Sequence, residues 1–348
     1  MEKVKVIIWG FGAMGSGMAK MLLKKQGVEI VGVCDKDTSK INKSIFEILN
    51  IKQTGRKEVI IKKNIEEIVT NNYADIALLC TDSYVKEAYE KIKYIIENKI
   101  NVISTAEEMV YAKAQYPEIA KQINSIAKEN GVTVLGTGIN PGLMMDLLAI
   151  VLTGACEEVN SIECKRVNSL SPFGPTVMEE QGVGIRPEEF YTRVNNGSLA
   201  GHIGFSESIK MITDAIGWKL DKPISQECNP IISSVYRKTP FAEVEEGNVA
   251  GVNMIGHGVI NGEKKVNMIH PQQIEPELEG VNTGDYINIK GNPNINMSIK
   301  PEIPGGIGTI AMCVNMIPHV INSKAGLRTM IDLPVPRAIM GDMRDLID

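Results

Sequence analysis

The 348-residue sequence lacks the features that mark proteins of membranes or nucleic acids. No apolar run reaches the roughly 18 residues of a membrane helix, and Val4 already opens a strand, which leaves no room for a signal peptide. The 37 Lys and Arg residues nearly balance 42 Asp and Glu, for a net charge of −5, and form no extended basic cluster. We therefore expect a cytoplasmic protein that binds small molecules, with no nucleic acid and no membrane as partner.

Cysteine and histidine are sparse and show no metal-binding spacing. The six cysteines form no CxxC pair and most lie in apolar runs, which is typical of buried, reduced thiols: Cys34, Cys80, Cys156, Cys164, Cys228 and Cys313. The four histidines show neither HxxxH nor HExxH spacing: His202, His257, His270 and His319. The sequence therefore predicts no metal site.

The sequence does contain a glycine turn between a strand and a helix. Residues 4–9 are mostly β-branched or apolar, GFGAMG follows, and apolar residues then recur at helical spacing. In this pattern the first glycine permits the turn, the second lets the backbone approach a pyrophosphate, and the third lets the helix pack on the strand. We predict that the turn binds a dinucleotide through Gly10, Phe11, Gly12, Ala13, Met14 and Gly15.

An acid follows the second predicted strand, residues 28–34. Asp35 lies about 20 residues after Gly15, where the dinucleotide fingerprint has the acid that binds the ribose hydroxyls. Its carboxylate should repel a 2′-phosphate, so we expect NAD to serve at least as well as NADP. The neighbouring Lys36 could reach a phosphate and permit the use of both.

Short apolar runs alternate with helical patterns through residue 136, which is typical of a doubly wound parallel sheet of the Rossmann type. The expected helices include residues 38–50 and 84–97. Ligands of such sheets bind beyond the carboxyl ends of the strands. Polar residues follow one buried strand there, and they fit either a helix cap or a contact with the nicotinamide ribose: Thr81, Asp82 and Ser83.

Two further stretches follow predicted strands at the same edge. Glu107 and Glu108 come directly after NVIS, where acids of a first helical turn complement the helix dipole. Asn140 precedes Pro141, a pairing typical of an N-cap and a first helical residue. We therefore expect a helix to begin at Pro141 with its N-terminus toward the cofactor, and we include Asn140 among the cofactor-binding residues.

Beyond Leu152 the pattern changes to strands with helical inserts. Strand-like runs occur at 159–167, 231–236, 249–260, 264–269 and 286–289, and helical patterns at 187–195 and 205–216. Asn261-Gly262 predicts a hairpin. An apolar helix at 309–320 should pack back on the first domain, before a tail with Pro334 and Pro336.

These patterns predict an α/β protein of two domains. Residues 1–145 should form the dinucleotide-binding Rossmann domain, with 306–348 packing back on it. Residues 146–305 should form a second α+β domain with a mixed, largely antiparallel sheet. We expect this second domain to bind the substrate and to form a homodimer through its sheet.

Five stretches carry a likeness to a known family: WGFGAMG, VISTAEEMVYA, GTGINPGLMMDLLAIVLT, GHIGFSES and KAGLRTMIDLPVPRAI. The chain resembles the 2,4-diaminopentanoate dehydrogenases of clostridial ornithine fermentation along essentially its whole length. It is more remotely similar to native amine dehydrogenases and to dihydrodipicolinate reductases, although it lacks the adjacent histidines followed by lysine and the SGT loop of the reductases. The resemblance implies oxidative deamination of 2,4-diaminopentanoate at C4 by NAD or NADP, giving 2-amino-4-oxopentanoate and ammonia.

Amine oxidation needs a neutral nitrogen, and therefore a base. The resemblance implies that this base is a glutamate just past the fifth strand, which is either Glu107 or Glu108; the other should cap a helix or pair with a cation. His202 matches an active-site histidine of the native amine dehydrogenases, or is a surface histidine before a helix. The substrate carboxylate needs a cation, for which the candidates are Arg166, Arg186, Arg193 and Arg237, although each more often would be a solvated surface charge.

Two other functions fit parts of the pattern. A dehydrogenase of the homoserine or aspartate-semialdehyde type shares the two-domain plan, but its catalytic cysteine should lie in a polar loop after a strand, where no cysteine clearly falls. A non-enzymatic NAD-binding sensor would keep the glycine turn but would have no use for the Glu107–Glu108 pair or for GHIG.

Overall fold

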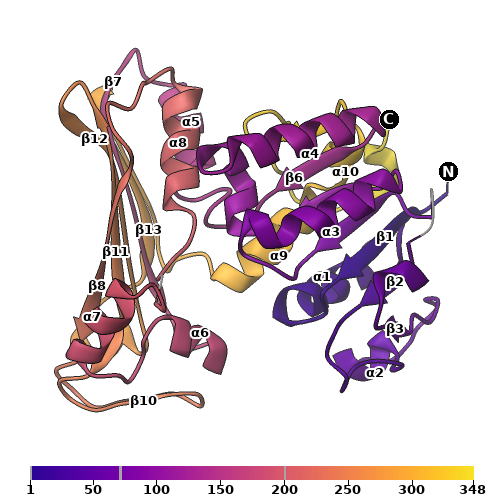
Figure 1. The fold of residues 1–348 in the computed structure, drawn as a ribbon, viewed down its shortest axis with the longest axis horizontal. Helices are drawn as coiled ribbons and strands as arrows, with labels where there is room; N and C mark the ends of the chain where they lie inside the picture. The colour runs from indigo at the N-terminus through magenta and orange to yellow at the C-terminus, as the bar shows by residue number, and fades with distance from the viewer. Residues whose placement is uncertain (1, 70–72, 200) are drawn as a thin grey trace. The chain divides into compact units, whose positions relative to one another are not determined.

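The computed structural model describes residues 2–69, 73–199 and 201–348, and the chain divides into two compact units (Figure 1). The first unit comprises Met1–Leu143 and Gly305–Asp348, and the second comprises Met144–Pro304. Each unit is built around one large sheet. The predicted fold class, a doubly wound parallel sheet with a second α+β domain, is confirmed.

The first sheet has seven strands, all parallel, in the order β15-β6-β5-β4-β1-β2-β3. The chain order reverses between β1 and β4, as in the doubly wound plan. The strands are almost wholly apolar because helices cover both faces. Their bounds are β1 (Val4–Trp9), β2 (Val28–Cys34), β3 (Ile61–Lys62), β4 (Ile76–Leu79), β5 (Asn101–Ser104), β6 (Thr133–Gly136) and β15 (Gly326–Arg328).

Helices α3 and α4 lie side by side over one face of this sheet (Figure 1). Helices α1 and α9 pack so closely that a Cβ on Gly17 would lie 2.2 Å from Cδ1 of Ile310. The helices of the unit are α1 (Ala13–Leu23), α2 (Ile45–Leu49), α3 (Val85–Glu97), α4 (Pro117–Glu129), α9 (Gly305–Asn315) and α10 (Ile317–Ile321). Its 3₁₀ turns are η1 (Ile65–Glu67), η2 (Glu107–Ala114) and η4 (Met343–Leu346).

The second sheet has six strands in the order β14-β13-β7-β12-β11-β8, and only its β7–β12 pair is parallel. The predicted hairpin joins β11 to β12, with positive φ at Asn261 (53°) and Gly262 (79°). The strands are β7 (Glu158–Ser169), β8 (Ser225–Ile232), β11 (Val249–Ile260), β12 (Glu263–Gln273), β13 (Gly284–Asn292) and β14 (Ile295–Ile299), beside a short ribbon of β9 (Arg237–Lys238) and β10 (Glu243–Val244).

One face of the second sheet carries helix α8. A Cβ on Gly256 would lie 2.6 Å from the Phe205 ring, so the missing side chain lets the helix approach β11. Figure 1 shows α5 and α8 together at one end of the sheet and α6 and α7 at the other. These elements are α5 (Leu147–Thr153), α6 (Pro175–Glu180), α7 (Pro187–Asn195), α8 (Phe205–Ala215) and the 3₁₀ turn η3 (Pro276–Glu279).

Two predicted helices of the first unit are wrong in extent. Within residues 38–50 the only helix is α2. Asn42, which precedes α2, has a φ of 64°, and a right-handed helix cannot continue through that conformation. No helix begins at Pro141 either. Gly142 has a φ of 125°, and the helix starts at Leu147, capped by the Asp146 side chain.

Other boundaries also differ from the expectations. The strand expected at 231–236 is β8, which ends at Ile232. The expected helix at 309–320 is split into α9 and α10, with Pro318, which has no N–H to donate, in the first turn of the second. The C-terminal segment also supplies β15, an edge strand that the sequence pattern did not reveal.

Candidate active site

The three glycines of the turn after β1 have different surroundings. Gly10 has a φ of 94°, and a Cβ there would lie 2.7 Å from the carbonyl oxygen of Cys80. A Cβ on Gly15 would lie 1.9 Å from the carbonyl oxygen of Gly10, whereas one on Gly12 would have nothing within 4 Å. Packing therefore requires glycine at positions 10 and 15, while Gly12 borders open space.

Helix α1 begins directly after Gly12, and no side chain caps it. The N–H groups of its first turn, which starts with Ala13 and Met14, therefore point toward the open space beside Gly12. The positive end of the helix dipole faces the same space. The turn also lies where the strand order reverses between β1 and β4, which is where doubly wound sheets bind dinucleotides. The residues present fit a dinucleotide at this edge of the sheet.

Asp35 connects the end of β2 to the glycine turn. Its Oδ2 accepts a hydrogen bond from the Phe11 N–H at 2.5 Å, and its Oδ1 accepts one from the Asp37 N–H at 2.8 Å. Lys40 Nζ lies 3.6 Å from Oδ2, while Lys36, the cation expected at this position, is exposed. The carboxylate is thus fixed beside the turn, and Lys40 is its cationic neighbour.

The polar residues after β4 do not cap α3, so that interpretation is wrong. The helix begins at Val85 with Tyr84 as its N-cap. Asp82 instead pairs with Lys91 of α3 at 2.6 Å and accepts a hydrogen bond from the Thr81 hydroxyl. The carbonyl of Ser83 accepts the Glu108 N–H at 3.2 Å. A contact of Thr81 to Ser83 with the nicotinamide ribose stays a prediction.

Glu108 is the side chain that caps α3. Its Oε2 accepts a hydrogen bond from the Val85 N–H at 2.7 Å, and Gln115 donates to its Oε1 at 3.5 Å. Only 4% of the residue is exposed, and burial raises the pKa of its carboxyl. A carboxylate in this position complements the positive end of α3. Glu107, the first residue of η2, is partly exposed.

The parallel topology collects most of the predicted cofactor and base residues at one edge of the first sheet. The glycine turn follows β1, Thr81 follows β4, Glu107 follows β5 and Asn140 lies in the turns after β6. Because parallel strands share their carboxyl edge, these residues lie along the same side of the unit. His202 belongs to the second unit.

His202 lies in a loop before α8 and packs edge-on against two rings. Its ring centroid is 4.7 Å from that of His270 and 5.7 Å from that of Phe205. Desolvation by these surroundings, together with the charge of Arg166, lowers the pKa of His202 to about 3. The pKa of buried His270 is also well below its usual value, and its Nδ1 lies 2.8 Å from the Arg166 carbonyl oxygen. Both rings are neutral near pH 7. His202 is partly exposed, and its place in the active site stays a prediction.

Two of the four arginines are not the surface charges that we expected. Arg166 is 2% exposed and donates to Asp285 Oδ1 and to the Ile303 carbonyl, each at 2.5 Å. Arg237 is fully buried and pairs with Glu279, so its role is structural. Arg186 is exposed, and Arg193 pairs with Glu189 on α7. The burial of the first two was not visible in the sequence, since each depends on a partner distant in the chain.

The cysteines give no support to a semialdehyde dehydrogenase. All six are free thiols, and Cys80 is the one that directly follows a strand of the first sheet at the glycine turn. Burial raises the pKa of the Cys80 thiol to about 12. Because the thiolate is the nucleophile, this cysteine is inert near neutral pH.

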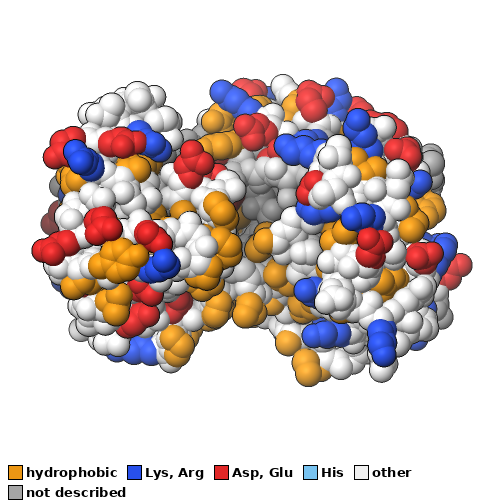
Figure 2. Space-filling model, turned by 90° about the horizontal axis from the view of Figure 1, so that it is seen from below, with side chains coloured by type: hydrophobic (Ala, Val, Ile, Leu, Met, Phe, Trp, Pro, Cys, Tyr) orange, Lys and Arg blue, Asp and Glu red, His pale blue; other side chains and the backbone are white. Residues whose placement is uncertain are grey.

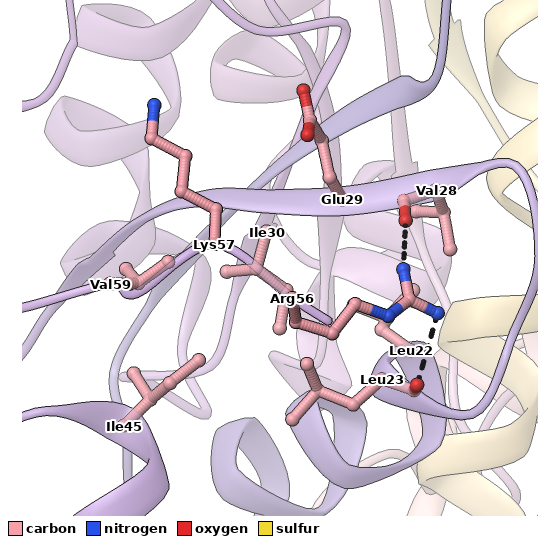
Figure 3. A pocket seen from close by; sticks show the side chains of 9 residues that line it. All are labelled: Leu22, Leu23, Val28, Glu29, Ile30, Ile45, Arg56, Lys57 and Val59. Carbon is pink, nitrogen blue, oxygen red and sulfur yellow. Dashed lines mark hydrogen bonds between the residues drawn. The ribbon is translucent and has the colours of Figure 1, made fainter. Parts of the chain in front are cut away.

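Two cavities of the first unit lie away from these residues. The one in Figure 3, beside the Arg56 guanidinium, has a volume of about 10 Å³, room for about one water. The Arg56 guanidinium, which lines this cavity, donates to the carbonyls of Val28 and Leu23 at 2.7 and 3.0 Å. The other, of about 360 Å³, lies between η2, α4 and residues 327–332. Neither is lined by a predicted site residue.

On the face in Figure 2, basic and acidic side chains alternate without an extended patch of either sign. Among the residues that the structure describes, no group of His, Cys, Asp and Glu could hold a metal. Within the same ranges, no helix is long and apolar enough to span a bilayer.

His270 and the Arg166–Asp285 pair were missed by the sequence interpretation. His270 lies in β12, Arg166 in β7 and Asp285 in β13, and the strand register sets them side by side. No local pattern of the sequence marks them, because their proximity depends on the register of three strands that are distant in the chain.

Known proteins resemble the chain over its full length. The family described as 2,4-diaminopentanoate dehydrogenase C-terminal domain matches residues 143–348, and the dihydrodipicolinate reductase N-terminus matches residues 4–132. A 2,4-diaminopentanoate dehydrogenase of Acetoanaerobium sticklandii is 63% identical over 347 residues, covering 100% of this chain and 98% of the relative.

Amine dehydrogenases are more distant relatives. One from Streptomyces virginiae is 19% identical over 97% of this chain and 98% of its own length. The solved structure of an amine dehydrogenase from Mycobacterium smegmatis superimposes with a TM-score of 0.86 at 25% identity, covering 97% of this chain and 98% of the other. The similarity thus includes both units of the fold.

Proposed function

The chain belongs to the 2,4-diaminopentanoate dehydrogenase family, and we propose that it oxidatively deaminates 2,4-diaminopentanoate at C4 with NAD or NADP, as a step in ornithine fermentation. The observation that carries this proposal is the 63% identity to a curated enzyme of that name over the whole chain. The glycine turn with Asp35, and the carboxylates after β5, support it from the geometry.

The reaction needs a proton acceptor beside the substrate amine. A nicotinamide cofactor held at the glycine turn would supply the acceptor for the hydride of C4. A base must first remove a proton from the C4 ammonium, because only the neutral nitrogen can donate its lone pair to the forming iminium. Water then adds to that carbon, and a proton passes from its oxygen to the nitrogen, which leaves as ammonia. We assign the base to Glu107, which is partly exposed at this edge of the sheet, whereas Glu108 is buried and caps α3.

Asp35 supports NAD as a cofactor at least as good as NADP. Its fixed carboxylate would accept bonds from ribose hydroxyls and repel a 2′-phosphate. Lys40, 3.6 Å away, would soften that repulsion. Steady-state assays with both cofactors test this, since a strong preference for NADP in kcat/KM contradicts the role given to Asp35.

A cytoplasmic homodimer formed through the second sheet is a further part of the proposal. One face of that sheet carries α8, while residues of the opposite face, such as Lys165, Ile255 and Asn267, are partly exposed. An open sheet face of this kind suits an isologous contact with a second copy. Light scattering after size exclusion gives the molar mass, and a monomer at micromolar concentration contradicts the dimer.

The decisive test of the function is absorbance at the NADH wavelength with purified protein. We expect turnover of 2,4-diaminopentanoate, with much lower rates on ornithine, lysine and simple amines. The organic product should be 2-amino-4-oxopentanoate, identified by mass spectrometry. An absence of turnover on every amine, with intact NADH binding, would favour the sensor function instead.

A further inference from the structure

Four amide side chains of the second unit have one unpartnered buried polar atom each, and three of these atoms belong to residues that are buried as a whole. These three atoms are Asn168 Oδ1, Gln181 Oε1 and Gln272 Nε2. The residues are only 6%, 7% and 7% exposed, respectively. A buried polar atom without a partner is costly, so native proteins rarely keep one unless something else satisfies it. Three together indicate a polar ligand.

The strand register places two of the amides side by side. Asn168 on β7 and Gln272 on β12 are direct partners in the parallel pair, so their side chains point to the same face of the sheet. His270, two residues before Gln272, points to this face as well. The face is therefore the one that His202 packs against.

Gln181 joins the same neighbourhood from the end of α6. Its amide nitrogen donates to the carbonyl of Gly201 at 3.4 Å, and the next residue is His202. Met178, one helical turn earlier, packs in one apolar cluster with Leu170 and Ile274, which lie two residues beyond Asn168 and Gln272. The three amides form a single group, here called the amide cluster.

The charged groups beside the amide cluster are paired or acidic. Arg166 is paired with Asp285 in a buried ion pair, and His202 and His270 are neutral near pH 7. The Glu302 carboxylate accepts a hydrogen bond from the N–H of Ser169, the residue next to Asn168, at 3.4 Å. A lone carboxylate would therefore be costly in this buried site, whereas a ligand group that also carries an ammonium brings its own compensating charge.

We propose that the amide cluster binds the α-amino-acid end of the substrate, its ammonium donating to the oxygens of Asn168 and Gln181 and its carboxylate accepting from the nitrogen of Gln272. This inference rests on the proposed function, which supplies a substrate whose zwitterionic end at C2 is separated from the reacting C4 by one carbon. The amide cluster would then distinguish 2,4-diaminopentanoate from a simple amine such as 2-aminopentane, whose reacting carbon is similar.

The test replaces single amides by a leucine of similar size. Gln272→Leu and Asn168→Leu should raise the KM for 2,4-diaminopentanoate roughly 10- to 100-fold, the usual effect of losing a hydrogen bond to a charged group. The kcat should stay within about threefold, and kcat/KM for 2-aminopentane should not fall. Gln272→Glu is the second variant, in case a leucine variant fails to fold. It keeps the shape of the side chain but places a carboxylate against that of the substrate, so the KM should rise by at least as much.

Asn253→Leu is the matched control. Asn253 Oδ1 is also buried without a partner, but Asn253 is the strand partner of Pro271. Because Pro271 lies between His270 and Gln272 on β12, the side chain of Asn253 points to the opposite face of the sheet. Its replacement should leave every KM unchanged. If the amides only order internal water, the cluster variants will change the melting temperature and not the KM, which overturns the proposal.

A binding assay separates this inference from the function. Norvaline carries the same zwitterionic end without the C4 amine, and ligand that binds the folded state raises the melting temperature. We expect norvaline to stabilise the wild type and not Gln272→Leu. If the wild type fails to oxidise 2,4-diaminopentanoate but shows this difference, the proposed reaction is wrong and the subsite stands. If norvaline stabilises neither protein, the subsite is wrong.

Discussion

The two units hold their charged groups in different ways. In the first unit, the carboxylates of Asp35 and Glu108 accept hydrogen bonds from the backbone N–H groups of Phe11 and Val85. In the second unit, the buried side chains of Arg166 and Asp285 form an ion pair with each other. The first arrangement gives each carboxylate a partner that only a substitution to proline can remove, since every other residue keeps its backbone N–H. The second depends on both residues being present.

This difference predicts how each unit responds to mutation. Changes at the carboxyl edge of the first sheet should lower rate or cofactor affinity while the fold persists. Changes among the buried charges of the second sheet should lower stability as well, because a charge left alone in a buried site is destabilising. The protein contains two tryptophans, Trp9 in the first unit and Trp218 in the second, so a Trp9→Phe background reports on the second unit alone.

The largest expected effect is on the rate, at Glu107. Glu107→Gln removes the proposed proton acceptor but keeps the shape, so kcat should fall by about two to four orders of magnitude, the usual contribution of general base catalysis. NADH affinity, measured by fluorescence, should hardly change. Glu108→Gln is the matched control, and it should keep its rate within about threefold while losing up to about 1 kcal/mol of stability. If both variants turn over normally, the base lies elsewhere and His202 is the next candidate.

The buried ion pair of the second unit should show the largest loss of stability. Asp285→Ala leaves the Arg166 guanidinium without its carboxylate at 2% exposure, which should cost about 3–5 kcal/mol. Urea unfolding followed by Trp218 fluorescence measures it. The exposed pair of Lys238 with Glu243 provides the comparison, since Lys238→Ala should leave the urea midpoint almost unchanged. Equal losses in the two variants would contradict the distinction between the units.

The neutral histidines of the second unit should make its stability depend on pH. The pKa of His202 is lowered from 6.5 to about 3, so below pH 6.5 the unfolded chain binds a proton that the folded one refuses. Stability is therefore fully present above pH 6.5 and declines as the pH falls toward 3. His270 acts in the same direction, whereas Asp285, whose pKa is raised by burial, acts in the opposite one.

The His202→Asn variant isolates this contribution. Between pH 7.5 and pH 5.5, the unfolding free energy of the wild type should fall by up to about 1.4 kcal/mol more than that of the variant. This difference follows because pH 5.5 lies one unit below the pKa of histidine in the unfolded chain. Urea titrations of both proteins at the two pH values give the difference. Identical pH dependence would mean that His202 is solvated and titrates normally in the folded protein.

The same contrast explains what could be predicted from the sequence. The glycine turn and the Asn261-Gly262 hairpin were predictable because neighbouring residues determine them. The helix expected at Pro141 failed because the positive φ of Gly142 is set by packing against Gly138, which a capping rule does not include. The surroundings of Arg166 depend on the register of β7 and β13, and no local pattern encodes it.

The smallest expected change in stability is at Gly12 of the glycine turn. It tests whether Gly12 serves the cofactor while Gly15 serves packing. A Cβ on Gly12 would meet nothing within 4 Å, so Gly12→Ala should change the unfolding free energy by less than about 0.5 kcal/mol. It should still weaken NADH binding by roughly tenfold, because its methyl group would occupy the space toward which the first turn of α1 points. Gly15→Ala is the counterpart, since its Cβ would lie 1.9 Å from the Gly10 carbonyl oxygen and should destabilise the first unit as well. Urea unfolding followed by Trp9 fluorescence, together with NADH titration, separates the two variants. If Gly12→Ala binds NADH as tightly as the wild type, the dinucleotide does not approach the backbone at this glycine.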